Sequence, residues 1–574
     1  MGIIGFPVGR RFGRTFLPVV AVLACTAIAA NARAQAKKNT NESSRQKLVA
    51  NLRKHIQHVF VIYQENRSFD SYFGSFPGAD NLATAEARAH GFRQWDAIGH
   101  TWITPFLLKA ADSADADHSR DALLTKVDHG RMDKFVSWEE QNLVNVKLTS
   151  PQFARQIGIL TMAYEDCTTI PFLWMYAHRF ALYDHIFQAM YGPSTPGNIA
   201  LIAGQTGQTQ AARHPDEAFK SAYGPGEPVV NDENPAFGPY AYPRQAHGAH
   251  QLDQTYATLM LTMSGRNASS VKIDTDDIKD DINELAKLNR KAVPWAWYQE
   301  GFGNGEGDDH PAYVTHHNSP QYFGYIRKNP SMWSGEHDLV DFFDSIEKRD
   351  LPPQSVVFVK GGRKNPFGWK PANPAAQEIL GDDDHPGYSD SQLSESLVAK
   401  VVNAIARSPY WKDSVIMVLW DDSEGFYDHV PPPQFETCPD KEPCGDGPRV
   451  PFILISPYAK SGRIISNPGD HASFAKFLDL LFNLPPLASL PDEKPYMPEG
   501  PRDTNPRLTD LLGGFDPARL SGAKPPIPAS QAEIPDNIVN HFPPAMSCKD
   551  TGVTPVIIPG ASLTPPKGFT NPLP

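Results

Sequence analysis

Two groups of acidic and amide residues stand directly after apolar runs that have the composition of buried strands. "VFVIYQEN" places Glu65 and Asn66 after one run, and "VIMVLWDDSEG" places Asp421, Asp422 and Glu424 after another. Ligands of open parallel sheets bind beyond the carboxyl ends of the strands, so we expect both groups at one edge of a sheet. A single acid there would cap a helix or face water. Two such groups without cysteine favour one divalent cation with oxygen ligands, whose identity stays open.

The stretch "MYGPSTPGNIALIAGQTG" predicts the start of a helix. Pro196 suits the first helical position, which makes Thr195 the expected N-cap and places Ser194 just outside the helix. Helix N-termini favour anions, because their N–H groups are free and the helix dipole is positive there. Ser194 is therefore a candidate nucleophile toward a phosphate, with its hydroxyl deprotonated on the metal. The alternative is that both hydroxyls only cap the helix.

Several histidines lie in polar contexts, in "DADHS", "VTHHNSPQYF" and "DDDHPGYS". They are His118, His316, His317 and His385. Any one of them alone is an ordinary histidine, but together with an oxygen-rich metal site they favour phosphoryl chemistry, in which imidazolium donates to phosphate oxygens and to the leaving group. Imidazole is mostly neutral above about pH 7, so we expect activity to decline as the pH rises.

The elements that must position these residues are short strands alternating with helices. "HVFVIY", "SVVFVKGG", "SVIMVLWDD" and "VPFILISP" are apolar on both faces, which is typical of strands covered on both sides. Residues 391–407 carry one apolar stripe and predict a helix. This alternation predicts an α/β fold with a mainly parallel central sheet flanked by helices. The 54 prolines indicate long ordered loops, and residues 210–253 have the composition of an insertion.

The two ends of the chain differ in composition from its centre. Residues 1–34 combine arginines, the apolar run "FLPVVAVLACTAIAA" and the small residues of "ARAQA", which predicts a signal peptide and a periplasmic or secreted protein. A retained anchor is disfavoured because the apolar run is short for a membrane span, and lipoprotein attachment at Cys25 is a further alternative. We expect a polar linker at 35–47, a catalytic domain at 48–515 and a proline-rich extension packed on that domain at 516–574.

The cysteine count indicates an oxidising compartment, and the net charge argues against binding of nucleic acid. Removal of Cys25 leaves Cys167, Cys438, Cys444 and Cys548, an even number that suits an oxidising compartment. Cys438 and Cys444 flank a short loop, where a disulfide is favoured over a zinc site, and Cys167 with Cys548 is what then remains. A net charge of −12 argues against nucleic acid as the partner. Oligomeric state is not predicted.

The motifs "QENRSFDSYFGSFPG", "GPSTPG", "HHNSPQYF", "DHPGYS" and "DDSEGFYDHVPPP", followed by "GPRVPFILISPYAKSG", resemble a bacterial phosphoesterase family over about residues 58–481. That family unites phosphatidylcholine-type phospholipases C with a respiratory-burst-inhibiting acid phosphatase. The resemblance implies an alkaline-phosphatase-like core. It implies that the metal ligands are Glu65, Asn66, Ser194, Asp421 and Asp422. It implies that the histidines around the phosphate are His118, His316, His317 and His385. Because Asp422 stands where the family usually has Glu, Glu424 is the alternative last ligand.

A serine in "GPS" resembles the acid phosphatase branch of the family, whereas the phospholipase branch commonly has threonine. We therefore expect an exported metal-dependent acid phosphatase that hydrolyses a phosphorylated small molecule through a phosphoserine. The alternative is a phospholipase C that cleaves phosphatidylcholine-type diesters of a phospholipid. The aromatic residues at 295–302 would then form a lipid-binding rim, although a place in the core is the favoured interpretation. A non-catalytic secreted binding protein is disfavoured because nucleophile, acids and histidines occur together.

Overall fold

The computed structural model describes residues 2, 42–145, 150–215, 228–232, 234–235, 251–303, 311–438 and 441–573. The predicted signal peptide and most of the predicted insertion lie outside these ranges. The chain divides into two units, Met1–Lys54 and His55–Pro574. In the first unit a helix begins at residue 42, so the end of the predicted linker is helical, and Gln46 donates to Glu42 one turn earlier. Within the described ranges, we find no helix of the length and apolar character that a membrane span requires.

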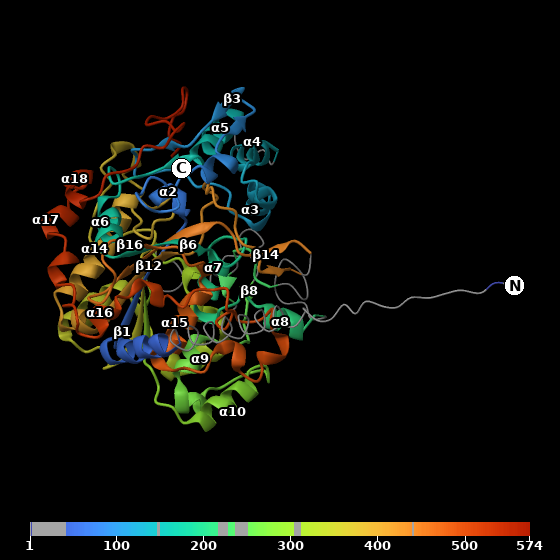
Figure 1. The fold of residues 1–574 in the computed structure, drawn as a ribbon, viewed down its shortest axis with the longest axis vertical. Coiled ribbons are helices and arrows are strands. Elements are labelled where there is room, and N and C mark those ends of the chain that lie inside the picture. The colour runs from blue at the N-terminus through green and yellow to red at the C-terminus, as the bar shows by residue number, and fades with distance from the viewer. Residues whose placement is uncertain are drawn as a thin grey trace. The chain divides into compact units, whose positions relative to one another are not determined.

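A nine-stranded sheet forms the centre of the second unit (Figure 1). Its strands, in spatial order, are β10 (Glu336–Asp338), β9 (Trp295–Gln299), β11 (Ser355–Lys360), β1 (His58–Gln64), β12 (Ser414–Trp420), β15 (Arg449–Ile455), β6 (Ala181–Phe187) and β16 (Arg463–Ile465), with β17 (Gly469–Asp470) also paired to β6. From β10 to β12 all neighbours are parallel, whereas β15 runs antiparallel to both β12 and β6. The predicted α/β fold with a mainly parallel sheet is confirmed.

The four predicted strands are β1, β11, β12 and β15. The other five strands of the sheet were not predicted, among them β6 and β9. In β6 the charged pair Asp184 and His185 interrupts the apolar run, and β9 is short and aromatic. Trp297 of β9 is fully buried and stacks on Phe358 of β11 with ring centroids 4.9 Å apart, so this tryptophan belongs to the core and not to a lipid-binding rim.

Helices cover both faces of the sheet. In the second unit, the described helices of eight or more residues are α3 (Arg120–Val127), α4 (Phe135–Asn145), α5 (Pro151–Leu160), α6 (Pro171–Arg179), α7 (Ser194–Ala203), α10 (Lys279–Leu288), α13 (Leu339–Lys348), α14 (Ser391–Ala406) and α15 (Ala472–Phe482). Phe342 of α13 meets Phe60 of β1 at 6.2 Å between ring centroids. Phe474 of α15 meets Phe358 of β11 at 5.8 Å. Because side chains alternate along a strand, these contacts place α13 and α15 on opposite faces.

The C-terminal segment from residue 516 lies along the rest of the second unit. Asn403 of α14 donates to the carbonyl of Ile534 at 2.7 Å, and Gln156 of α5 donates to the carbonyl of Gly568 at 3.1 Å. A disulfide joins Cys167 to Cys548 across 381 residues, and a second joins Cys438 to Cys444. Both cysteine pairs are those expected from the sequence, and the longer one ties this segment to the sheet-bearing part of the chain.

Candidate active site

The carboxyl ends of the central strands β1 and β12 bring the two acidic groups together. The strands are paired in parallel up to Gln64 and Trp420. Beyond them the chains stay bonded, since Asp421 N donates to Gln64 O at 3.2 Å and Arg67 N donates to Asp422 O at 2.9 Å. All four predicted acidic and amide ligands are fully buried here, namely Glu65, Asn66, Asp421 and Asp422.

Asn66 and Glu424 both have left-handed backbone, with φ of 62° and 57°. This conformation is uncommon outside glycine and costs energy that surrounding contacts must offset. Asn66 N donates to Asp421 Oδ1 at 3.0 Å, and Asn66 Nδ2 donates to Glu424 Oε2 at 2.6 Å. Glu424 Oε1 accepts from Ala116 N at 2.7 Å. Glu424 thus positions Asn66, and Asp422 rather than Glu424 faces the serine.

Ser194 is the first residue of α7 and is fully buried. Its Oγ lies 3.4 Å from Asp422 Oδ2. The prediction that Thr195 is the N-cap was wrong, because the extended residue Pro193 holds that position and Thr195 is already helical. The Thr195 N–H donates to Asp232 Oδ1 at 3.0 Å. The helix therefore begins earlier than expected, and the serine lies at its N-terminus instead of before it.

The oxygens of this cluster fit a cation. Among the described residues, three of its buried oxygens have no hydrogen-bond partner, namely Glu65 Oε2, Asn66 Oδ1 and Asp421 Oδ2. Burial raises the pKa of Glu65 well above its usual range, and the Asp421 carboxylate raises it further. Burial and Asp421 do the same to the pKa of Asp422. Two features are expected of a metal site, namely buried carboxyl groups whose pKa is raised and buried oxygens that have no hydrogen-bond partner.

Two further side chains, Lys360 and His317, contact the Glu65 carboxylate. Lys360, the last residue of β11, is fully buried, bonds Glu65 Oε1 and lies over the Tyr63 ring at 4.5 Å. His317 Nε2 lies 3.3 Å from Glu65 Oε2, without hydrogen-bond geometry. We did not predict Lys360 from the sequence, although a lysine that ends a wholly apolar strand beside predicted acids is a usable signal.

The four predicted histidines lie close together, but the pKa of His118 is shifted in the opposite direction to those of His316 and His317. Ring centroids are 5.8 Å apart for His118 and His385, 6.3 Å for His317 and His385, and 4.3 Å for His316 and His317. Burial lowers the pKa of His316 to about 4 and that of His317 well below its usual range. Burial also disfavours protonation of His118, but Asp422 and Asp115 outweigh it and raise its pKa to about 9. His118 is thus the imidazole that its surroundings keep charged near neutral pH.

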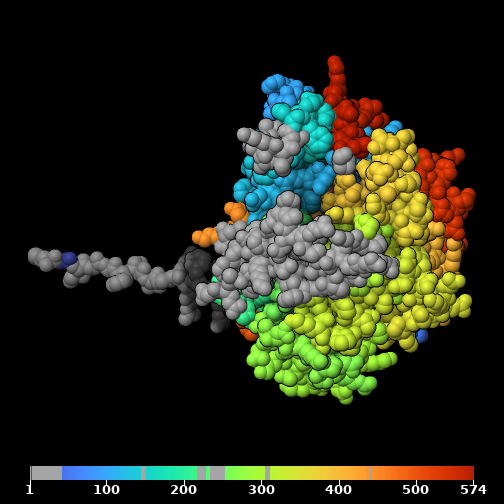
Figure 2. All heavy atoms as spheres, turned by 180° about the vertical axis from the view of Figure 1, so that it is seen from behind, coloured from blue at the N-terminus to red at the C-terminus, as the bar shows by residue number. Residues whose placement is uncertain are grey.

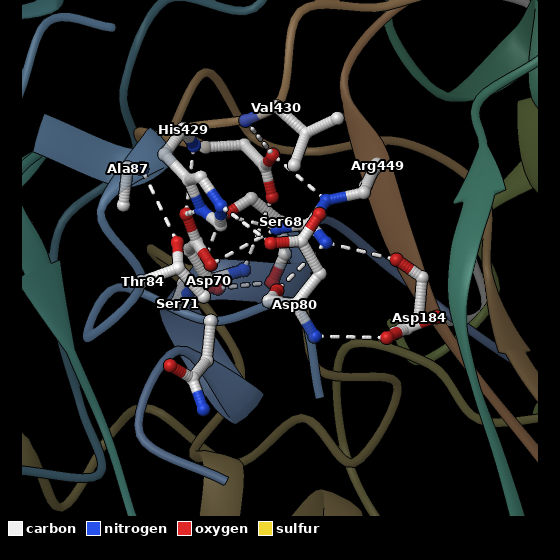
Figure 3. A network of polar contacts seen from close by, with 12 residues as sticks. Ser68, Asp70, Ser71, Asp80, Thr84, Ala87, Asp184, His429, Val430 and Arg449 are labelled. Carbon is white, nitrogen blue, oxygen red and sulfur yellow. Dashed lines mark hydrogen bonds and ion pairs between the residues drawn. The ribbon is translucent and has the colours of Figure 1, made fainter. Parts of the chain in front are cut away.

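A second buried polar cluster lies beside the active-site loops, and we call it the Asp70 network (Figure 3). Its members are Asp70, Asp80, Asp428, His429 and Arg449. Arg449 Nη2 pairs with Asp70 Oδ1 at 3.1 Å and Arg449 Nε pairs with Asp428 Oδ1 at 2.9 Å. His429 Nδ1 lies 2.7 Å from Asp70 Oδ2, and its Nε2 lies 3.2 Å from Asp80 Oδ1. Because Arg449 already supplies the positive charge, we assign no metal here. The network ties the segment after β1 to the segment after β12.

The Asp70 network predicts a pH-dependent stability. Burial lowers the pKa of His429, but Asp70 and Asp80 outweigh it and raise the pKa to about 9. An unfolded histidine titrates near about 6.5, so the stabilising effect is complete below that pH and is lost as the pH rises through about 9. We expect the difference in unfolding free energy between wild type and His429→Gln, measured in urea, to shrink by roughly 3 kcal/mol across this window.

The matched control for that measurement is His541→Gln, because His541 is exposed. Its difference from wild type should stay close to zero at each pH. A His429→Gln difference that did not change between about pH 6 and pH 9.5 would show that His429 is not charged in the folded protein.

The model of the Phosphoesterase family matches residues 56–485, which is most of the chain. The chain belongs to the Phosphoesterase family. The matched range contains both strand-end acid groups, Ser194 and the four histidines. The family predicted from the motifs is therefore confirmed.

Curated relatives of this Phosphoesterase chain carry the name phospholipase C. A non-hemolytic phospholipase C of Burkholderia pseudomallei is 22% identical over 516 residues, covering 85% of this chain and 62% of that protein. Phospholipase C B of Mycobacterium tuberculosis is 28% identical over 459 residues, covering 75% and 74%. The chain spans 62%, 54% and 53% of three phospholipase C relatives from Burkholderia and Pseudomonas, which is less than two thirds of their length.

A solved structure of a protein in the alkaline phosphatase superfamily from Vibrio parahaemolyticus matches with a TM-score of 0.27 and 12% identity. The match covers 58% of this chain and 63% of that chain. A similarity this low supports no functional conclusion.

Proposed function

We propose that this chain is a metal-dependent phosphoester hydrolase in which Ser194 attacks phosphorus. One observation supports this most strongly: a fully buried serine at the N-terminus of a ten-residue helix lies 3.4 Å from Asp422 in a cluster with three unpaired ligand oxygens. A hydroxyl in this setting has both an activating environment and a helix N-terminus that attracts anions. A capping serine would need neither.

The residues proposed to hold a divalent cation are Glu65, Asn66, Ser194, Asp421 and Asp422. When bound, the cation would neutralise charge on the phosphate oxygens and lower the pKa of the Ser194 hydroxyl. Lys360 would hold Glu65 in its charged form, because its ammonium bonds Glu65 Oε1 in a fully buried contact. Glu424 would orient Asn66, which it bonds at 2.6 Å.

The histidines are proposed to serve the phosphate and the leaving group. His118 donates from Nδ1 to the carbonyl of Ala116 at 2.8 Å, which fixes the ring orientation, and in the neutral ring Nε2 accepts from Asn66 Nδ2 at 3.1 Å. A protonated ring would give up the contact with Asn66 and donate from Nε2 instead. His118 is the one whose pKa the surrounding carboxylates raise to about 9, so it would donate a proton or hydrogen bond to a phosphate oxygen. His385 lies between the others, with its ring centroid 5.8 Å from that of His118 and 6.3 Å from that of His317, so His316, His317 and His385 would line the same phosphate site.

The first candidate substrate is a phosphomonoester of a small molecule, which is the acid phosphatase prediction made from Ser194. The second is a phosphatidylcholine-type diester, which is supported by the name phospholipase C of the Burkholderia and Mycobacterium relatives. We expect purified protein to hydrolyse p-nitrophenyl phosphate faster than p-nitrophenylphosphorylcholine, with a rate that holds while His118 is charged and falls as the pH rises through about 9. The reverse preference would establish the phospholipase alternative, and no turnover of either would remove the proposal.

We also propose that the chain is exported. Two disulfides, Cys167–Cys548 and Cys438–Cys444, suit an oxidising compartment. N-terminal sequencing of the mature protein should begin near Gln35. A product that starts at Met1 and stays in the cytosol would contradict export.

A further inference from the structure

Exposed apolar side chains are concentrated on three segments. Among the described residues, seven large apolar side chains are exposed, and five of them lie at residues 86–109, 150–157 and 556–570. These five are Trp95, Trp102, Phe153, Ile557 and Leu563, with exposed fractions of 42%, 53%, 37%, 84% and 65%. The other two, Leu288 and Val340, lie on separate helices. Single exposed apolar residues are ordinary on a protein surface, but five on three segments that touch one another call for a binding partner.

The three segments are neighbours in space. Leu107 N donates to Ser562 O at 2.9 Å, which joins residues 86–109 to the C-terminal segment. Gln156 Nε2 donates to Gly568 O at 3.1 Å, and Arg155 Nε pairs with Asp96 Oδ2 at 2.8 Å, which joins α5 to both. In Figure 1 the hairpin strand β3 (Thr101–Ile103), α5 and red C-terminal chain lie together at the top, and Figure 2 shows blue and red atoms there from behind.

Trp95 and Trp102 form an ordered aromatic pair on the hairpin of β2 (Gln94–Asp96) and β3. Trp95 and Trp102 are directly paired across the strands, and their ring centroids lie 5.3 Å apart at an interplanar angle of 66°. The Arg93 guanidinium lies over the Trp102 ring at 5.1 Å. A hairpin that presents two indoles and a guanidinium to solvent has the composition of membrane-interface anchors, because indole is apolar with one polar tip.

Charge on these segments is opposite to that of the chain. Among the described residues, the exposed charged side chains at 86–109, 150–157 and 556–570 are Glu86, Arg88, Arg93, Lys109 and Lys567. Four basic residues minus one acidic residue give +3, on a chain whose net charge is −12. An acidic protein with a basic, tryptophan-bearing surface is complementary to an anionic surface.

We propose that this surface, which we call the Trp95 surface, docks the protein on an anionic lipid bilayer. Trp95 and Trp102 would enter the headgroup region with Leu563, and Arg93, Lys109 and Lys567 would pair with lipid phosphates. The inference goes beyond the proposed hydrolysis and does not depend on it. The exposed apolar side chains project from three different segments. Such a surface suits insertion among lipid headgroups better than packing against a folded protein partner.

The test is flotation of the purified protein with vesicles of phosphatidylcholine containing phosphatidylglycerol, at low and high salt. Wild type should float with these vesicles and bind less at high salt, because surface charge attraction is screened. The double variant Trp95→Ser with Trp102→Ser should bind at least about tenfold more weakly, a change equal to about 1.4 kcal/mol. Its rate on a soluble phosphomonoester should equal that of wild type, which separates failure of docking from failure of the active site.

The matched control is Leu288→Ser with Val340→Ser, which removes two apolar side chains of similar exposure, 42% and 43%, outside the Trp95 surface. It should float like wild type. Equal flotation of the tryptophan variant, or no flotation of wild type, would overturn the proposal. A wild-type dimer that the tryptophan substitutions dissociate would overturn it in favour of a second copy of this chain as the partner.

Discussion

Replacing Ser194 with alanine is expected to reduce phosphoester turnover by about a thousandfold or more, because the proposed nucleophile is lost. The protein should still fold. The hydroxyl makes one long contact, 3.4 Å to Asp422 Oδ2, and the α7 backbone does not depend on it, since Asn198 Nδ2 bonds the Ser194 carbonyl at 2.8 Å. Binding of inorganic phosphate, measured by protection against thermal unfolding, should persist in Ser194→Ala.

The matched control is Ser423→Ala, at the same edge of the sheet. Ser423 is fully buried, and within the described chain its hydroxyl has no hydrogen-bond partner, so its removal should leave the rate within about twofold of wild type and the stability nearly unchanged. Thr195→Ala tests the neighbouring hydroxyl. If Thr195→Ala abolished turnover and Ser194→Ala did not, the assignment would be wrong by one residue.

Replacing Asp421 with asparagine is expected to remove the bound divalent metal and, with it, most activity. Asp421 Oδ1 accepts from Asn66 N at 3.0 Å and from Asp422 N at 2.7 Å, whereas Oδ2 is unpaired among the described residues. Asparagine can keep both bonds through its oxygen while its amide nitrogen replaces the unpaired ligand oxygen. The substitution thus removes one ligand and one charge with little change in shape.

Metal content of purified wild type and Asp421→Asn, measured by elemental analysis, checks this prediction. Wild type should hold about one divalent ion per chain, as the proposed ligand cluster implies, and Asp421→Asn much less. The control is Asp390→Asn, because Asp390 is also buried and accepts from two backbone groups, Gln392 N and Leu393 N, through Oδ1 alone, outside the cluster. Equal metal in Asp421→Asn and wild type would contradict the ligand assignment. Loss of metal in both variants, but not in wild type, would point to unfolding instead.

The central part of the sheet could be predicted from the sequence because its strands are buried on both faces. β1, β11, β12 and β15 are continuous apolar runs, and such runs leave few other structures open. The apolar stripe of α14 predicted that helix equally well. β6 was missed because Asp184 accepts from the Asp80 backbone N–H and His185 contacts the Asp80 carboxylate, so the polar residues inside this strand reflect tertiary contacts that no local pattern contains.

The candidate site, too, could be predicted from the sequence only in part. Acids that end parallel neighbouring strands must meet, so Glu65 and Asp421 could be placed together from sequence. The start of α7 could not, since Pro193 and Pro196 are both suitable near a helix N-terminus and a tertiary bond from Thr195 N to Asp232 accompanies the earlier start. Lys360 was missed because its partner, Glu65, is 295 residues away in sequence.

The most direct test of the central claim is chemical trapping of the intermediate. Wild-type protein mixed with a phosphomonoester and quenched in acid should yield a peptide that carries one phosphoryl group on Ser194, identified by fragmentation mass spectrometry. Ser194→Ala treated in the same way should yield none. The account predicts this phosphoserine in wild type during turnover. Turnover with no phosphorylated peptide, or with the phosphoryl group on another residue, would contradict it.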